Sequence, residues 1–250
     1  MILVFAAMQS EVRLALGWLR DYRESDIAGF PTIEAEGIVI CQSGLGRRAI
    51  KASGAVIDKF PPDVVLSIGV AGGLKPALEC GDIIVCETID HELHRASGKI
   101  ESVTCSPSLI EAALAAGRGF GLHVSPGTSL TLDEAAWTAD AKAEHHAWKG
   151  HDIVEMESFW VGQAAAEAGA PYLAVRSISD AADHPLPKTG AMKDDGNFDP
   201  DALLAYVQEH PEAAPLIAAQ AERAQPAFGN LAILLTGLLP PLVQHFNAAR

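Results

Sequence analysis

Three carboxylates stand in short polar segments beside apolar runs of the chain, where they could exchange protons with a ligand. Glu11 follows the apolar start of the sequence, Glu157 lies in Val-Glu-Met-Glu-Ser, and Asp180 ends Arg-Ser-Ile-Ser-Asp. A carboxyl group serves as a general acid or base when its surroundings bring its pKa near the working pH. Each acid also has an ordinary interpretation, since acids favour the first turn of a helix and aspartate is a common N-cap. The residue types therefore allow acid–base chemistry without requiring it.

Two glycine-containing segments follow apolar runs and could bring the backbone close to a ligand. Ser-Gly-Leu-Gly at 43–46 matches neither the dinucleotide fingerprint nor the phosphate loop, and such short turns are common. Gly-Val-Ala-Gly-Gly-Leu at 69–74 is more informative, because Gly72 and Gly73 suggest a close approach of the backbone to another group. A tight turn explains this pair equally well, so neither segment identifies a ligand.

The elements that must position these residues follow from the alternation of short apolar runs with amphipathic stretches. This pattern is typical of buried parallel strands separated by helices and predicts an α/β fold. We expect strands at Ile2–Ala6, Gly37–Cys41, Val64–Ile68, Asp82–Cys86 and Tyr172–Val175. We expect helices at Arg47–Phe60, Ser108–Arg118, Asp133–Glu144 and Ser158–Ala168. Because ligands gather beyond the carboxyl ends of parallel strands, the polar segments should meet at one edge of the sheet.

Length, composition and charge bound the class of protein. The chain has 250 residues, of which 49% are hydrophobic and 20% charged, which is enough apolar material for one large core. We expect a single domain over residues 1–250, in which residues 184–250 form a long lid loop and C-terminal helices. The net charge of −14 would repel phosphate backbones and anionic membranes, so we expect no nucleic-acid partner.

Histidines, cysteines and an apolar stretch are present, but without the spacing or length that a metal site, a disulfide framework or a membrane span needs. His91 and His94 end a predicted strand, and His145 and His146 are neighbours on opposite sides of a helix, so we expect no metal site. The N-terminus lacks the features of a signal peptide, and Leu231–Val243 is short and interrupted by glycine and prolines, so we expect no transmembrane segment. Four cysteines without paired spacing indicate buried thiols and a cytoplasmic protein: Cys41, Cys80, Cys86 and Cys105.

Taken in order, the segments resemble the nucleoside phosphorylase and nucleosidase superfamily, most closely its 5′-methylthioadenosine/S-adenosylhomocysteine nucleosidase branch. The resemblance covers residues 1 to about 183 and is carried by AAMQSEV, SGLGRRAIKA, PPDVVLSIGVAGGLKPALECGDIIV, VEMES and VRSISDAAD. It implies a three-layer α/β/α fold with a central mixed, mostly parallel sheet. It also implies cleavage of the N-glycosidic bond of a purine nucleoside by a homo-oligomer, and we expect no cofactor.

The resemblance implies a catalytic role for four residues. As the glycosidic bond breaks, the ribose becomes positive and the purine negative, so a proton delivered to purine N7 stabilises the leaving group. Asp180 matches the family's acid, and general acid catalysis is typically worth about 10² to 10⁴ in rate. Glu11 would orient and deprotonate the attacking water. Arg176 and Ser179 would position Asp180 and the nucleophile.

The resemblance also implies a set of substrate-binding residues. Glu157 corresponds to the acid that binds the ribose hydroxyls, and Met156 would pack on the sugar. Backbone groups of the glycine-rich segment would approach the purine and the sugar. The remaining members of the implied set are Glu155, Val70, Ala71, Gly72 and Leu130.

The sequence departs from the nucleosidase branch at three places. Val70 stands where a small hydroxyl residue is common, and Leu130 stands where the family usually offers an aromatic face to the base. Arg47 and Arg48 follow Gly46 and would suit a phosphate nucleophile, although arginines at a helix start can also be merely solvated. Because the first loop lacks the Gly-Asp-Pro-x-Arg phosphate grip of hexameric purine nucleoside phosphorylases, both water and phosphate stay open as nucleophiles.

The tail beyond residue 179 is longer than the nucleosidase C-terminus and resembles the hopanoid-associated phosphorylases, which implies adenosylhopane as a substrate. The apolar stretch Leu231–Leu239 could cover a lipid, or it could pack on the sheet or at a subunit interface. We therefore expect a purine nucleosidase or nucleoside phosphorylase that acts on a 5′-modified adenosine. The alternative is a nucleoside-binding or sensing protein of the same fold. A serine hydrolase is disfavoured because no Gly-x-Ser-x-Gly occurs.

Overall fold

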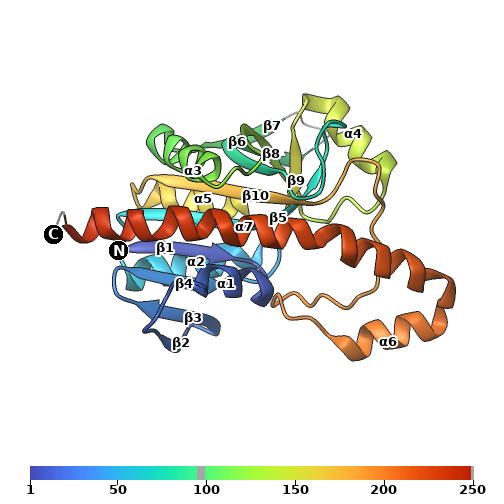
Figure 1. Cartoon of the computed structure of the whole chain (residues 1–250), viewed down its shortest axis with the longest axis horizontal. Coiled ribbons are helices and arrows are strands. Elements are labelled where there is room, and N and C mark those ends of the chain that lie inside the picture. Colours follow the sequence, from blue (N-terminus) through green and yellow to red (C-terminus); the bar gives the residue numbers. More distant parts are fainter. Residues whose placement is uncertain (95–98, 249–250) are drawn as a thin grey trace.

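Helices cover both faces of a mixed central sheet (Figure 1). The computed structural model describes residues 1–94 and 99–248, with the side chains of all but 92–94 and 99–101. On one face the long helix α7 (Ala214–Ala248) packs against α1 (Gln9–Leu16) and α3 (Pro107–Gly119). Behind the sheet, α2 (Arg48–Lys59) and α5 (Ser158–Glu167) pack against each other. The predicted α/β class is confirmed.

The sheet closes on itself at one side. Its order is β10-β6-β8-β9-β5-β1-β4-β3-β2, with β7 paired to β6 and an additional pairing between β10 and β5. The strands β5, β9, β8, β6 and β10 therefore form a ring, while β4, β1, β5 and β10 run parallel. The strands are β1 (Ile2–Ala6), β2 (Arg23–Ile27), β3 (Phe30–Ala35), β4 (Ile38–Gln42), β5 (Val64–Gly73), β6 (Ile83–His94), β7 (Lys99–Thr104), β8 (Val124–Thr131), β9 (Ile153–Glu155) and β10 (Tyr172–Asp180). This ring brings the carboxyl ends of β5, β9 and β10 together.

The predicted strands are confirmed, but two of them continue through segments that were expected to be loops. The glycine-rich segment at 69–74 is strand as far as Gly73, and Arg176–Asp180 is strand throughout. The reason is a change of partner, because the end of β5 pairs with β9 and β10 after it leaves β1. Gly72, for example, lies opposite both Val154 and Asp180. The chemistry-bearing residues thus stand on paired strands.

Three of the four predicted helices are confirmed within two residues at each end, and the fourth begins later than expected. The helix α4 (Ala139–Lys149) replaces the predicted Asp133–Glu144, because Thr138 is its N-cap and its hydroxyl accepts the Ala141 amide at 3.1 Å. The short or polar strands β2, β3, β7, β8 and β9 were not predicted. Their pairing to neighbouring strands, rather than an apolar run of their own, stabilises them.

The C-terminal quarter begins with an irregular segment, residues 181–199, called the strap below. The strap leads to α6 (Pro200–Glu209), a 3₁₀ turn (Pro211–Ala213) and α7, and α6 protrudes from the body of the molecule (Figure 1). Two helices were expected after a long loop, and α6 and α7 follow the strap. The strap is anchored at its far end, where the Leu45 amide donates to the Asp194 carbonyl at 2.8 Å and the Gln42 amide group donates to the Asp195 carbonyl at 2.8 Å.

The apolar C-terminal stretch lies within one continuous helix, although glycine and prolines interrupt its apolar run. Pro226, Pro240 and Pro241 all lie inside α7. Each proline removes one backbone donor, whereas burial of the neighbouring leucines stabilises the helix. Among the described residues, one helix (Pro211–Ala248) is long and apolar enough to cross a membrane, judged by length and composition. In this fold its buried side chains are Ala227, Leu231, Leu234, Leu235, Leu238, Leu239, Leu242 and Val243.

Candidate active site

A cleft of about 1130 Å³ opens at the carboxyl ends of β5, β9 and β10. It gathers segments that are far apart in the sequence: the loop after β1, the start of α2, the end of β5, the β9–α5 junction and the end of β10. The sequence-predicted residues that line it are Glu11, Gly46, Arg47, Arg48, Val70, Ala71, Gly72, Glu155, Met156, Glu157, Ser179 and Asp180. Arg176 and Leu130 do not line it.

Glu11 is fixed in the cleft by two backbone amides. It lies in the first turn of α1, where its carboxylate oxygens accept the amides of Met8 at 2.9 Å and Val70 at 2.8 Å. Gly69 permits this approach, because a Cβ there would lie 2.5 Å from Glu11 Oε1. Burial raises the pKa of Glu11, while Arg176 and the amide donors oppose that rise. The result is a buried, oriented carboxyl that can take up a proton.

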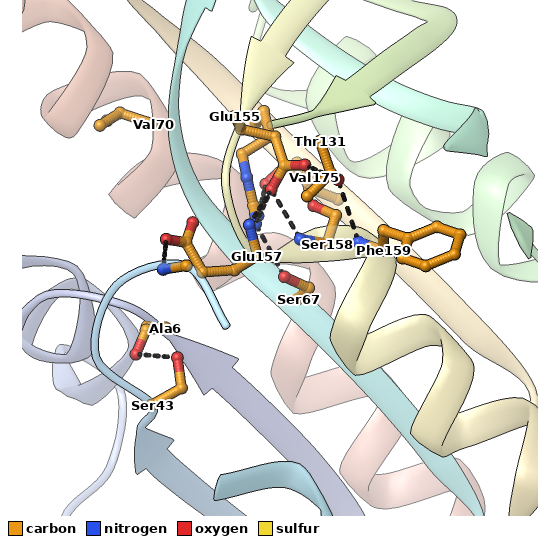
Figure 2. Close-up of polar contacts among 12 residues, drawn as sticks. Ala6, Ser43, Ser67, Val70, Thr131, Glu155, Glu157, Ser158, Phe159 and Val175 are labelled. Atoms are coloured by element: carbon orange, nitrogen blue, oxygen red, sulfur yellow. Dashed lines mark hydrogen bonds and ion pairs between the residues drawn. The ribbon is translucent and has the colours of Figure 1, made fainter. Parts of the chain in front are cut away.

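Glu157 joins the β9–α5 junction to the loop before α2. Its Oε1 accepts the Gly46 amide at 2.7 Å (dashed line at Glu157 in Figure 2), and the residue is buried. Burial, reinforced by the nearby Glu155 carboxylate, raises the pKa of Glu157 to about 8. Gly46 has a φ of +57°, so the turn presents its amide to Glu157 in a conformation that favours glycine. The Gly46 amide therefore already has a hydrogen-bond acceptor.

Next to Glu157, Glu155 and Arg176 form a buried ion pair. Arg176 Nη2 donates to Glu155 Oε2 at 3.1 Å and to the Ser67 hydroxyl at 2.8 Å. The same carboxylate oxygen accepts the amides of Glu157 at 2.9 Å and Ser158 at 2.6 Å (Figure 2). Glu155 therefore caps the start of α5 and fixes the backbone of Glu157, while Arg176 compensates its charge.

Two further residues complete this support and were missed by the sequence analysis. The Thr131 hydroxyl contacts Glu155 Oε1 and also accepts the Phe159 amide at 3.1 Å (Figure 2). Ser67 lies in the middle of β5, and its hydroxyl oxygen accepts a hydrogen bond from Arg176 Nη2. Both belong to strands, Ser67 within β5 and Thr131 at the end of β8, and their sequence surroundings give no signal, since a buried hydroxyl is recognised by its partner on another element.

Asp180 ends β10 and has both carboxyl oxygens engaged. Oδ1 accepts the Ser179 hydroxyl at 2.7 Å, and Oδ2 contacts the ammonium of Lys142, which comes from α4. Burial raises the pKa of Asp180, while Lys142 opposes this rise. The sequence analysis missed Lys142, because the sequence of α4 is largely polar and predicts a helix on the surface. The glycine at 72 leaves room for this pair, since a Cβ there would lie 3.0 Å from Asp180 Oδ2.

The two arginines at the start of α2 differ in their surroundings. Arg47 donates to both carboxylate oxygens of Asp133, from Nε at 2.7 Å and from Nη2 at 3.0 Å, and its guanidinium lies 4.7 Å from the Trp160 ring centroid. Arg48 lies over the Phe30 ring at 5.0 Å. The charge of Arg47 is thus already matched by an acid across the mouth of the cleft.

The structure also locates the remaining predicted positions. Leu130 is fully buried in β8 opposite Val154, whereas Trp137 and Phe30 contribute aromatic rings to the cleft wall. Val70 contributes its amide to Glu11 and carries no hydroxyl. Among the described residues no group of three His, Cys, Asp or Glu side chains is placed to hold a metal ion, and the His94 side chain lies outside them.

Comparisons with known proteins agree on one family. The profile of the phosphorylase superfamily matches residues 2–205. Over 199 residues the chain is 28% identical to a 5′-methylthioadenosine/S-adenosylhomocysteine nucleosidase of Lysinibacillus sphaericus, covering 72% of this chain and 86% of the relative.

Solved structures share the whole architecture. The 5′-methylthioadenosine/S-adenosylhomocysteine nucleosidase of Neisseria meningitidis, in complex with methylthio-immucillin-A, has a TM-score of 0.75 at 24% identity and covers 95% of this chain and 97% of that one. The native futalosine hydrolase of Helicobacter pylori has a TM-score of 0.70 at 19% identity and covers 94% and 97% of the two chains. At these identities the structural similarity shows the fold.

Proposed function

Because the chain belongs to the phosphorylase superfamily, we propose that it hydrolyses the N-glycosidic bond of a purine nucleoside, with a 5′-modified adenosine as the substrate. One observation carries the proposal. A single cleft gathers the buried carboxyls of Glu11 on α1, Glu157 at the β9–α5 junction and Asp180 on β10, at the edge of the sheet where ligands bind. Acid, base and sugar-binding groups are what this reaction needs.

The reaction assigns one step to each carboxyl. Asp180 gives a proton to purine N7 as the bond between C1′ and N9 breaks, and the electron pair of that bond leaves with the purine. Glu157 accepts hydrogen bonds from the ribose hydroxyls, and Met156 packs on the sugar. Glu11 takes a proton from water as the water oxygen bonds to C1′. The products are the free purine and the free sugar. Exchange with solvent then returns a proton to Asp180 and removes the proton from Glu11.

The surroundings of the arginines favour water over phosphate as the nucleophile. Arg47 is engaged by Asp133, and the Gly46 amide is engaged by Glu157, so two groups that could bind phosphate are committed elsewhere. Glu11 lies in the cleft, where an added anion would meet a carboxylate. Phosphorolysis remains the second candidate because Arg48 and Lys51 also line the cleft.

Adenine release measured with and without phosphate distinguishes the two nucleophiles. Hydrolysis predicts the same rate in phosphate-free buffer and free sugar as the product. A rate that requires phosphate, with a sugar 1-phosphate as the product, would establish phosphorolysis instead.

A substrate panel tests the 5′ substituent. The relatives reported above are named for methylthioadenosine, S-adenosylhomocysteine and futalosine, so the panel contains these three, adenosine and a 5′-alkyl adenosine. Adenosylhopane, suggested by the tail alone, is the sixth member. Turnover of none of them by the purified protein would favour the nucleoside-binding alternative, which is supported by the missing hydroxyl at Val70.

Asp180→Asn separates an enzyme from a binder. We expect turnover to fall by about 10² to 10⁴ with ligand affinity retained. Because this change leaves the ammonium of Lys142 without its carboxylate, the melting temperature is measured in parallel. The double variant Asp180→Asn with Lys142→Met serves as the matched control for folding.

Assembly and location are further parts of the proposal. The apolar composition favours a homo-oligomer, which sedimentation of the purified protein tests. All four cysteines are free thiols in the structure, which supports a reducing compartment and hence the cytoplasm. Fractionation of the native cells tests this location.

A further inference from the structure

One fully buried charge has no step in the reaction described above. Lys142 on α4 is 0% exposed, although lysine is almost never fully buried unless it is paired. Its ammonium contacts Oδ2 of Asp180 and donates to the carbonyl oxygens of Ala181 at 2.8 Å and His184 at 2.9 Å. Each of its three hydrogens therefore has an acceptor, and its charge is compensated by Asp180.

The contact fixes the direction of the carboxyl. Ser179 donates to Oδ1 of Asp180 at 2.7 Å, so the two oxygens are held from two sides while the residue lines the cleft. Gly72 packs against the same pair, since a Cβ there would lie 3.0 Å from Asp180 Oδ2 and 3.5 Å from Lys142 Cε. Three elements, α4, β5 and β10, thus determine where this carboxyl lies.

We propose that Lys142 is the positioning residue for the acid of the reaction. It directs the carboxyl of Asp180 toward the bound purine and, as the buried cation in contact with it, sets the pH range over which Asp180 keeps its proton. This inference rests on the proposed function, in which Asp180 protonates the leaving purine.

Lys142 has the dominant electrostatic effect on this carboxyl. The other titratable groups that interact with Asp180 are His184 on the strap and Cys80 in the loop between β5 and β6, and Arg223 on α7 interacts with Cys80. Burial favours the neutral acid, and the contact with Lys142 favours the carboxylate. Removal of the cation leaves burial opposed only by the weaker influences of Ser179 and His184, so Asp180 should hold its proton to a higher pH.

Infrared spectroscopy of the Asp180 carboxyl tests the inference without a substrate. The variants are Lys142→Met, Lys142→Arg and, as a control on the exposed side of α4, Lys149→Met. The double variant Lys142→Met with Asp180→Asn identifies the band. We expect the titration midpoint of Asp180 to rise by about one to three pH units in Lys142→Met, to stay near wild type in Lys142→Arg, and to be unchanged in Lys149→Met.

Kinetics provide the second readout. The high-pH limb of the kcat/KM profile should move upward with the infrared midpoint in Lys142→Met, while kcat at the optimum falls about tenfold or more because the carboxyl is less firmly oriented. Lys142→Gln gives the same comparison if methionine prevents folding, since it also removes the charge. If Lys142 had only a structural role, its substitution would change stability but would leave the infrared midpoint and the high-pH limb of the kcat/KM profile unchanged.

The two proposals fail in different ways. An unshifted Asp180 midpoint in folded Lys142→Met or Lys142→Gln overturns the inference, even if the wild type turns over nucleosides. Absence of turnover by the wild type overturns the proposed function and is seen before any variant is made.

Discussion

Three carboxyls of the cleft share one physical condition, because burial raises the pKa of Glu11, Glu157 and Asp180 alike. The groups that oppose this rise in pKa differ among the three residues. Glu11 is stabilised as a carboxylate by Arg176 and backbone amides, and Asp180 by Lys142, whereas Glu157 lies beside a second carboxylate, Glu155. Different neighbours therefore allow residues of the same type to take different parts in one reaction.

Glu157→Gln should make the protein more stable relative to wild type as the pH rises. The pKa of Glu157 is raised to about 8 from an ordinary value of 4.5, so between these values the unfolded chain loses a proton that the folded chain keeps. The wild type therefore loses stability across this window, and glutamine, which still accepts the Gly46 amide, does not. Urea unfolding from pH 5 to 8 should show that the difference in unfolding free energy between Glu157→Gln and wild type grows by a few kcal/mol. The growth should be at most about 1.4 kcal/mol per pH unit.

The exposed acid Glu24 on β2 provides the matched control, and Glu24→Gln should follow the wild-type curve. Parallel stability curves for wild type and Glu157→Gln would show that the carboxyl is ionised in the folded protein at neutral pH. The same variant should also lose ribose binding if the proposed role is right, so the two effects are measured on one sample.

At the scale of elements, the sequence predicts the central strands and three of the helices because long apolar runs dictate buried parallel strands. It also brings much of the site together, since Glu11 and Asp180 follow predicted strands, whereas Glu157 follows β9, which was not predicted. Lys142, Thr131 and Ser67 could not be found in this way. Their role comes from a partner on another element, and a polar residue in a helix or strand gives no local signal that it is buried.

Gly72→Ala tests the close packing of β5 against the acid. A Cβ at this position would lie 3.0 Å from Asp180 Oδ2 and 3.2 Å from Val154 Cγ1, so the carboxyl or the strand must move. We expect kcat/KM to fall by about tenfold to 100-fold with a small change in melting temperature, because displacement of a reacting group is costly. Gly54→Ala on α2 is the control, since nothing lies within 4 Å of the added carbon. It should keep wild-type kcat/KM and gain about 0.5–1 kcal/mol of stability.

Gly196→Ala tests whether the strap must lie against the loop after β1. Gly196 has a φ of +81°, its carbonyl accepts the Gln9 amide at 3.2 Å, and a Cβ there would overlap the Ala7 carbonyl. We expect faster hydrogen exchange in the strap and a loss of kcat/KM. Gly190→Ala controls for backbone strain alone, because Gly190 has a φ of +67° with nothing within 4 Å. Equal effects in both variants would mean that strain, and not the contact with Ala7, matters.

At the scale of the whole molecule, α7 follows α6 and the 3₁₀ turn and packs against β10, α3 and α1. Its composition alone would suit a membrane, yet 39% of its most apolar window is buried inside this fold. The buried side is made of leucines that face the sheet, and the exposed side includes Leu216 and Ile233. The helix therefore acts as a layer of the domain, and its leucines should contribute to stability according to their burial.

A pair of substitutions in this one helix tests that conclusion. Leu235 is 0% exposed and Leu216 is 37% exposed. In purified protein without detergent, Leu235→Ala should lower the free energy of unfolding by about 2–5 kcal/mol, because it leaves a cavity beneath α7. Leu216→Ala should change it by about 0.5 kcal/mol or less, as for other surface positions. If instead the two variants unfold alike, and lipid vesicles stabilise the wild type but not Leu216→Ala, the exposed face of α7 is a membrane-binding surface and not simply the solvent side of a structural layer.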